Sequence, residues 1–191
     1  MPALAEACLA GGARFLQIRA KHTPSGALLQ ICEQVVAAAR PAGAVVIVND
    51  RADIAALAQA AGVHLGQDDL NPADARRILG GFAVVGISTH SVEQARAAAR
   101  APVDYIAVGP VFSTSTKVTG HTAVGTALVS DVRAILDKEG IDTPIVAIGG
   151  ITLERAPDVI RAGAASVAVI SDLLSRGNPE ARVREYLSAL K

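Results

Sequence analysis

The sequence is poor in aromatic residues and has no tryptophan: three Phe and two Tyr make up 3% of its 191 residues. Apolar residues nevertheless account for 51% of the chain, so its core must be built from small aliphatic side chains. A chain of this length is enough for one domain with a single core, and no linker or shift in composition indicates a second. We therefore expect residues 1–191 to form a single domain.

Net charge and long apolar runs are also missing. Eighteen basic and eighteen acidic residues cancel, which argues against nucleic acid as a partner and leaves phosphate binding to a local site. No apolar run approaches the ~20 residues of a membrane-spanning helix. Residues 1–13 carry no basic segment of the kind that opens a signal peptide. The chain is therefore expected in the cytoplasm, with no membrane as a partner.

Reactive side chains are few. Cys8 and Cys32 have neither metal-ligand nor redox spacing, which favours free thiols in a reducing cytosol. The four histidines complete no Ser/His/Asp order and no convincing Cys/His pair, so nucleophilic catalysis has little support. His64 falls within an apolar run and is expected to pack, whereas His90 lies near a strand end and is expected to orient its neighbours.

The chain does contain a regular alternation of Val/Ile-rich runs and Ala-rich helical segments. The runs lack polar alternation, which is typical of parallel strands buried on both faces, and they span 15–18, 45–48, 63–65, 84–87, 105–108, 145–148 and 167–170. Helices are expected near 2–11, 25–40, 51–61, 72–79, 91–100, 126–139, 152–162 and 179–190.

Repeated strand–helix units predict an α/β fold with a parallel sheet, either doubly wound or a (β/α)8 barrel. Eight helices against seven strands, with no strand before the helix at 2–11, favour a (β/α)8 TIM barrel whose first strand is missing from this chain.

Polar or glycine residues follow every predicted strand. Ligands of parallel α/β folds bind beyond the carboxyl ends of the strands, so this pattern indicates a binding site rather than a scaffold. Asp50 and Asp69 follow neighbouring strands, and two carboxylates beside Arg19 and Lys21 suit Mg²⁺, which keeps waters and binds substrate phosphates. By residue type alone, each aspartate is better explained as a cap for the following helix.

Two other segments have the composition of a phosphate site. Gly149 and Gly150 stand between a strand and a helix, where backbone amides can approach an anion, and Ser171 follows the next strand. In many barrels these last two loops bind phosphate. The stretch "GPVFSTSTK" at 109–117 adds hydroxyl donors and a lysine, although a flexible polar loop over 112–124 would also explain the hydroxyls.

The chain resembles thiamine-phosphate synthase over essentially its whole length. The resemblance rests on seven segments in family order: "LQIRAK" (16–21), "VNDRADIA" (48–55), "GVHLGQDDL" (62–70), "VGISTHS" (85–91), "DYIAVGPVFSTSTK" (104–117), "VAIGGIT" (146–152) and "VAVISDL" (167–173). It implies a (β/α)8 barrel and a reaction in which an aminopyrimidine methyl diphosphate loses pyrophosphate and a thiazole phosphate nitrogen attacks the methylene. Both substrates are small molecules, and a homodimer is left open.

The resemblance also implies residue roles. Asp50 and Asp69 match Mg²⁺ ligands, while the expected catalytic groups that stabilise the leaving pyrophosphate are Lys117, Ser88 and Arg19. The positions that match substrate contacts are Gln17, Arg19, Lys21, Asn49, Ser88, Thr114, Thr116, Lys117, Gly150, Ile170 and Ser171.

Two alternatives compete with the synthase. A thiazole tautomerase of the same fold resembles this family, but it typically has histidine where this chain has Pro110 and lacks parts of the metal and lysine set. A non-catalytic phosphate-binding barrel is the second. The chain departs from the family pattern at Ala20, where an acidic residue is usual; on an extended strand this position points away from Arg19 and Lys21.

Overall fold

Seven parallel strands form one sheet in the computed structural model, which describes residues 1–113 and 123–190. Each strand pairs with the next along the chain, in the order β1 (Phe15–Ile18), β2 (Val45–Asn49), β3 (Gly62–Leu65), β4 (Val84–Thr89), β5 (Tyr105–Val108), β6 (Ile145–Ile148) and β7 (Ser166–Ala168). A doubly wound sheet reverses its strand order part-way, so this sequential order excludes that alternative. The expected α/β fold with a parallel sheet is confirmed.

The eight predicted helices are present, together with two elements that were not predicted, the 3₁₀ turn η1 and the one-turn helix α8. They are α1 (Pro2–Ala10), α2 (Ser25–Ala39), the 3₁₀ turn η1 (Arg40–Ala42), α3 (Ala52–Leu57), α4 (Pro72–Leu79), α5 (Val92–Ala98), α6 (Gly125–Lys138), α7 (Ala156–Arg161), α8 (Ser171–Leu174) and α9 (Pro179–Ala189). The one-turn helix α8 was not expected, and the predicted strand at 167–170 ends two residues earlier, because Ile170 already caps α8.

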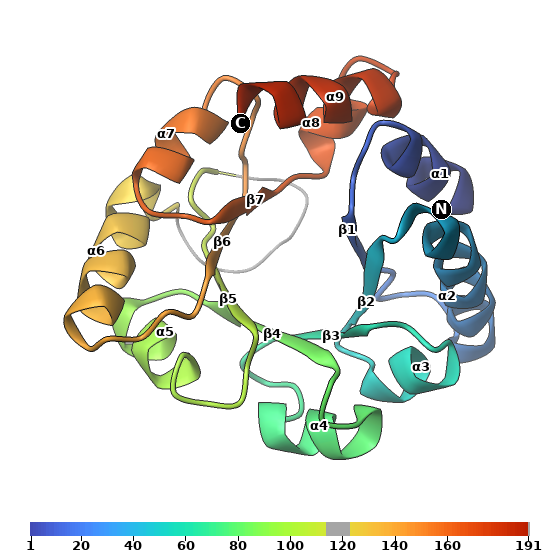
Figure 1. The fold of residues 1–191 in the computed structure, drawn as a ribbon, viewed down its shortest axis with the longest axis horizontal. Coiled ribbons are helices and arrows are strands. Elements are labelled where there is room, and N and C mark those ends of the chain that lie inside the picture. The colour runs from blue at the N-terminus through green and yellow to red at the C-terminus, as the bar shows by residue number, and fades with distance from the viewer. Residues whose placement is uncertain (114–122, 191) are drawn as a thin grey trace.

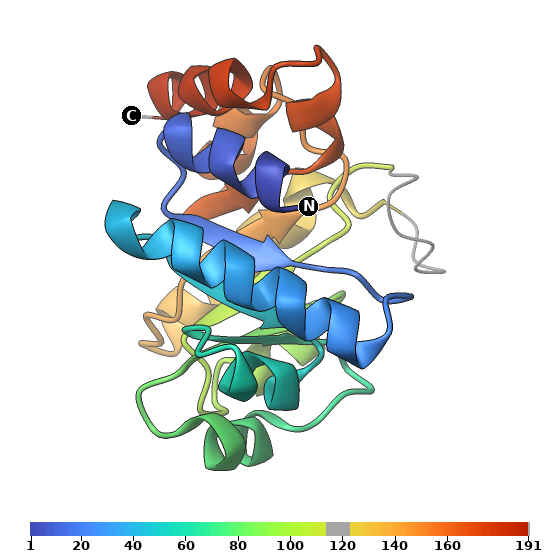
Figure 2. The same ribbon diagram turned by 90° about the vertical axis from the view of Figure 1, so that its right-hand side faces the viewer.

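The sheet curves around a central axis, with the helices on its outer side (Figure 1). At the two ends of the sheet, α1 lies beside α9 in both views (Figure 2). The contact is close, because a Cβ on Gly11 would lie 2.6 Å from the Glu180 carbonyl oxygen. The strands do not close in the same way: β1 and β7 are the edges of the sheet, and the side chains of Phe15, Ser166 and Ala168 are exposed there.

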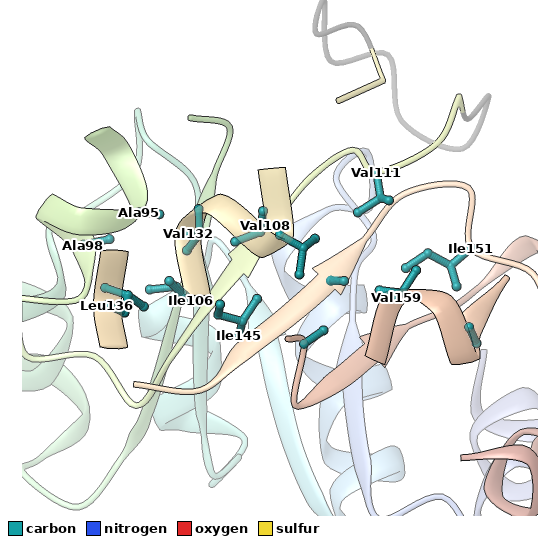
Figure 3. Close-up of a cluster of buried hydrophobic side chains, with 14 of the residues drawn as sticks. Ala95, Ala98, Ile106, Val108, Val111, Val132, Leu136, Ile145, Ile151 and Val159 are labelled. Carbon is teal, nitrogen blue, oxygen red and sulfur yellow. The ribbon is translucent and has the colours of Figure 1, made fainter. Parts of the chain in front are cut away.

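The largest hydrophobic cluster lies between β5, β6 and the helices outside them (Figure 3). Ile106 and Ile145 from the sheet are fully buried with Val132 and Leu136 from α6. The largest fully buried side chains are all Ile, Leu or Val, which confirms the expected core of small aliphatic residues. Among the described helices, none is both long and apolar enough to cross a membrane.

Candidate active site

The carboxyl ends of β1, β2 and β3 bring one lysine and two aspartates together. The Lys21 Nζ lies 2.9 Å from Asp50 Oδ2, and the Asp69 carboxyl group is close enough to act on the pKa of Asp50. Asp50 has a left-handed backbone, with φ of 64°, a conformation that aspartate tolerates better than most residues. Its N–H donates to the His64 carbonyl oxygen at 2.8 Å, which ties this turn to β3.

Neither aspartate caps a helix with its side chain, so the capping explanation is wrong. Helix α3 begins after Arg51, whose side chain makes no capping bond, and α4 is capped by Asn71, whose side chain accepts from the Asp74 N–H. Asp69 instead accepts from the Gly66 N–H at 2.7 Å, because the chain turns back on itself before α4 begins.

The two carboxylates have opposite pKa shifts. Burial acts to raise the pKa of Asp50, but the bond from Lys21, the Asp69 carboxyl group and the charges of Lys21 and Arg19 outweigh it and hold that pKa below its usual value. The pKa of Asp69 is raised by burial and by the neighbouring Asp50, against the lowering effect of the Gly66 amide. A hard divalent cation bound between the oxygens of the two carboxylates would therefore be stabilised by both of them.

Serine and histidine side chains occupy the ends of the middle strands. Ser88 is buried near the end of β4, where its carbonyl oxygen accepts from Gln67 Nε2 at 2.7 Å and its hydroxyl lies 2.8 Å from His64 Nε2. His90 is hydrogen-bonded through Nδ1 to the Gly109 carbonyl oxygen, so it joins the ends of β4 and β5. His64 is buried within the sheet, as expected, and His90 has the expected orienting position.

A pocket of about 320 Å³ lies beyond β6 and β7, lined by Ser113, Gly150, Ile151, Thr152, Arg155, Ser171, Asp172 and Ser175. Its wall depends on the glycine pair, since Gly149 and Gly150 have φ of 95° and 61°. A Cβ on Gly150 would also lie 2.5 Å from the Ser113 carbonyl oxygen. The Phe112 N–H donates to the Gly149 carbonyl at 3.0 Å, so the segment after β5 lies directly against the segment after β6.

Comparisons with known proteins identify the family of this chain. The thiamine monophosphate synthase family model matches residues 1–173. The chain belongs to this family. It is 42% identical to the thiamine-phosphate synthase of Anaeromyxobacter dehalogenans, over 99% of this chain and 82% of that one. The enzyme of the same name from Roseiflexus castenholzii is 41% identical, over 95% of this chain and 77% of its own length.

A solved structure supports the same relationship. The thiamine phosphate pyrophosphorylase of Pyrococcus furiosus superimposes with a TM-score of 0.88 and 28% identity, over 99% of this chain and 88% of that chain. The sequence-based prediction of a thiamine-phosphate synthase, and hence of a transferase, is confirmed by these relatives of the family.

Several of the predicted family positions lie at the rim of the sheet in the structure. Arg19 is exposed and close enough for its charge to act on the pKa of Asp50, and Asn49 ends β2 half-buried. Ile170 is 46% exposed at the start of α8, next to Ser171 in the pocket wall. The predicted contacts at Thr114, Thr116 and Lys117 lie outside the described residues.

Sequence reasoning missed Arg155 in this family member. Its side chain lines the pocket beside Gly150 and Ser171, and its guanidinium carbon lies 4.6 Å from the centre of the Phe112 ring. The available signal was a cation five residues after the glycine pair, close to the start of α7.

A second omission is the network that holds the pocket's α8 side. Asp172 Oδ2 accepts from the Leu153 N–H at 3.2 Å, from the Tyr186 hydroxyl at 2.6 Å and from Arg182 Nη2 at 2.9 Å. The Arg182 side chain is only 3% exposed and also pairs with Glu185 at 2.6 Å. Asp172 thereby joins the segment after β6 to α8 and α9, which positions both walls of the pocket.

Proposed function

We propose that this chain is a thiamine phosphate synthase that condenses 4-amino-2-methyl-5-pyrimidinylmethyl diphosphate with 4-methyl-5-(2-phosphoethyl)thiazole. The observation that carries the proposal is that a cluster suited to a metal ion and a separate pocket lie on one rim of the sheet. The Lys21–Asp50–Asp69 cluster lies beyond the first three strands, and the pocket around Gly150 lies beyond the last two. A reaction between a diphosphate and a monophosphate needs both regions.

The chemistry proposed is a dissociative substitution. The bond between the pyrimidine methylene and the diphosphate oxygen breaks, and pyrophosphate leaves with the electron pair. The lone pair of the thiazole nitrogen then forms the new carbon–nitrogen bond, and no proton has to be removed from that nitrogen. The site therefore needs cations and hydrogen-bond donors rather than a general base, and Arg19, Ser88 and Lys117 are the proposed catalytic groups.

Gln17, Arg19, Lys21 and Asn49 are proposed to hold the pyrimidine diphosphate, together with Ser88 and Lys117. Asp50 and Asp69 would hold one Mg²⁺, because two carboxylates leave most of its coordination to water and substrate phosphate. The pKa of Asp69 is raised first by burial and then by Asp50, and the closeness of the two carboxylates supports this assignment, since a cation would relieve their repulsion. When bound, Mg²⁺ would supply charge to stabilise the departing pyrophosphate.

The thiazole phosphate is proposed to occupy the pocket beyond β6 and β7. Its contacts would be Gly150, Ile170 and Ser171, with Thr114 and Thr116. Arg155 adds the positive charge that these groups lack, and Gly150 allows the phosphate to approach the backbone.

We further infer that residues 1–191 are a single domain, and that its seven strands are those of a (β/α)8 TIM barrel whose first strand is missing from this chain. The sequential parallel order and the ring of outer helices support this (Figure 1). Amide hydrogen exchange tests it: the outward-facing amides of β1 and β7 should exchange quickly, and strong protection would contradict it.

We also infer a cytoplasmic location, which is supported by the free thiols Cys8 and Cys32. The number of subunits, including a homodimer, is tested by measuring the molar mass in analytical ultracentrifugation.

The test is an assay with both phosphorylated precursors and Mg²⁺. Formation of thiamine phosphate and pyrophosphate in equal amounts is expected, with loss of turnover when Mg²⁺ is chelated. Lys117→Ala should lower turnover strongly, whereas Lys138→Ala, at the end of α6, is the matched control. A folded protein that isomerises the thiazole but forms no product would identify the tautomerase instead. Phosphate binding without either reaction would identify a non-catalytic barrel.

A further inference from the structure

Three residues of neighbouring strands form one row across the inner side of the sheet. His64 in β3 is level with Gly86 in β4, and Gly86 is level with Tyr105 in β5. Gly86 has no side chain, and this leaves room for the Tyr105 ring, because a Cβ on Gly86 would lie 2.0 Å from the Tyr105 Cζ. The two rings meet over this glycine, with Tyr105 Oη 2.7 Å from His64 Nδ1 and ring centres 5.6 Å apart.

The row connects to groups of the proposed active site at both ends. Ser88 lies two residues beyond Gly86 on the same face of β4, and its Oγ is 2.8 Å from His64 Nε2. At the other end, the Gln17 side chain of β1 lies close enough to the Tyr105 hydroxyl to act on its pKa. His64, Ser88 and Tyr105 are each at least 94% buried, so water competes little for these bonds.

The chemistry of each group sets the direction of donation. Burial raises the pKa of the Tyr105 hydroxyl, which keeps its proton, while the Gln17 side chain acts to lower that pKa. The hydroxyl lies 2.7 Å from His64 Nδ1, a distance at which a protonated phenol donates to a neutral imidazole nitrogen. The Tyr105 proton is then directed at His64 Nδ1. A neutral imidazole that accepts at Nδ1 carries its proton on Nε2 and donates it to Ser88 Oγ.

We propose that Tyr105 and His64 form a one-way chain of hydrogen-bond donors that turns the Ser88 hydroxyl proton toward the pyrophosphate leaving group. Because Ser88 Oγ already accepts from His64, its own proton points out of the chain and is available to an anion. In the opposite tautomer, Ser88 would donate inward to His64 and present only lone pairs to the diphosphate. Tyr105 and His64 are thus positioning residues, and Ser88 is the residue that meets the substrate. This inference rests on the proposed synthase function.

The tautomer itself is the first test, and it needs no activity. Nitrogen-15 NMR of the wild-type protein, with His64 assigned through a His64→Gln variant, should show the proton on Nε2 and an accepting Nδ1. A proton on Nδ1 would overturn the inference, even if the enzyme makes thiamine phosphate. Conversely, a protein with the expected tautomer but no synthase activity would refute the proposed function and leave the hydrogen-bond chain standing.

Kinetics of matched variants form the second test. Tyr105→Phe keeps the ring but removes the donor, so kcat should fall about tenfold for the loss of one well-directed hydrogen bond, with KM for the thiazole phosphate unchanged. In a Ser88→Ala background, the same Tyr105→Phe change should have no further effect, because the chain then has no end group to orient. Fully additive losses would show a general structural role for Tyr105 and overturn the inference.

His64 variants separate donation from packing. The amide of His64→Gln can still donate toward Ser88, so this variant should retain severalfold more activity than His64→Leu, which fills similar space without a donor. Equal losses in both variants, with melting temperatures that also match, would contradict a directional role. Circular dichroism of each variant establishes that it is folded before rates are compared.

Discussion

The ammonium group of Lys21 lies 2.9 Å from the carboxylate of Asp50, which links the segment after β1 to the end of β2. The pair is partly exposed, so its contribution to stability is small, of the order of 1 kcal/mol or less. Its effect on the site is larger, because the positive charge helps to lower the pKa of Asp50, whereas burial and the neighbouring Asp50 raise the pKa of Asp69. A divalent cation bound to both carboxylates would offset the repulsion between them.

Asp50→Asn should therefore weaken Mg²⁺ activation. Removal of one of two carboxylate ligands loses several kcal/mol of charge stabilisation, which corresponds to a decrease in kcat of more than about a hundredfold. Rates measured over a Mg²⁺ titration check this, and the activating concentration should rise as well. Asp53→Asn is the control, since this exposed aspartate pairs with Arg51 on the outside of α3. An unchanged Mg²⁺ response in Asp50→Asn would remove Asp50 from the metal site.

Gly150→Ala should disrupt the phosphate pocket. The Cβ would lie 2.5 Å from the Ser113 carbonyl oxygen, so the segments after β5 and β6 must separate. Gly43→Ala is a matched control, because Gly43 has φ of 60°, against 61° for Gly150, and has open space around it. Backbone strain alone costs about 1–2 kcal/mol in the control, and the clash should add about 1–3 kcal/mol at Gly150. Urea unfolding of the two variants measures this difference.

Arg155→Ala should raise KM for the thiazole phosphate about tenfold and leave KM for the pyrimidine diphosphate unchanged. The reason is that a charge-assisted bond to phosphate is worth roughly 1.5–3 kcal/mol, and Arg155 lines only the pocket beyond β6 and β7. Arg161→Ala, an exposed arginine at the end of the same helix, is the control. Equal changes in both KM values would mean that Arg155 does not act on the thiazole phosphate.

Asp172→Asn should destabilise the fold, by about 3 kcal/mol, because it leaves the buried Arg182 without its inner partner. Burial alone would raise the pKa of Asp172, but the bonds from Tyr186 and Arg182 outweigh it and lower that pKa. The pKa of Asp172 is lower in the folded protein than its value of about 4 in the unfolded chain, so the ionised carboxylate stabilises the fold above about pH 4. This stabilisation is lost as the pH falls through the native pKa.

Unfolding free energies of wild type and Asp172→Asn should therefore converge below about pH 4 and differ most near neutrality. Glu180→Gln, which removes an exposed i,i+4 pair with Arg184 on α9, should cost less than about 0.5 kcal/mol. A constant difference between wild type and Asp172→Asn across this pH range would contradict the role assigned to its charge.

Much of the fold was predictable because its inner strands, such as β3 and β5, are buried on both faces and therefore appear as continuous apolar runs. Five predicted strands, at 15–18, 45–48, 63–65, 105–108 and 145–148, match the structure to within one residue. The last strand was placed wrongly because an apolar run, 167–170, continues into the cap of α8, and hydropathy does not distinguish the end of a short strand from the start of a one-turn helix. The placement of Asp50 and Asp69 on one rim was also predictable, since neighbouring parallel strands end on the same side.

The sequence by itself determined the parallel α/β architecture and the set of polar residues at the strand ends, because hydrophobic runs and the residues that follow them are local features. Only the tertiary structure decided which of those residues meet. The opposite pKa shifts of Asp50 and Asp69 depend on the register of β2 and β3. The bond between His64 and Tyr105 depends on the absence of a side chain at Gly86, which leaves room for the Tyr105 ring. Such contacts join residues far apart in the chain, so their geometry is set by packing rather than by any local pattern.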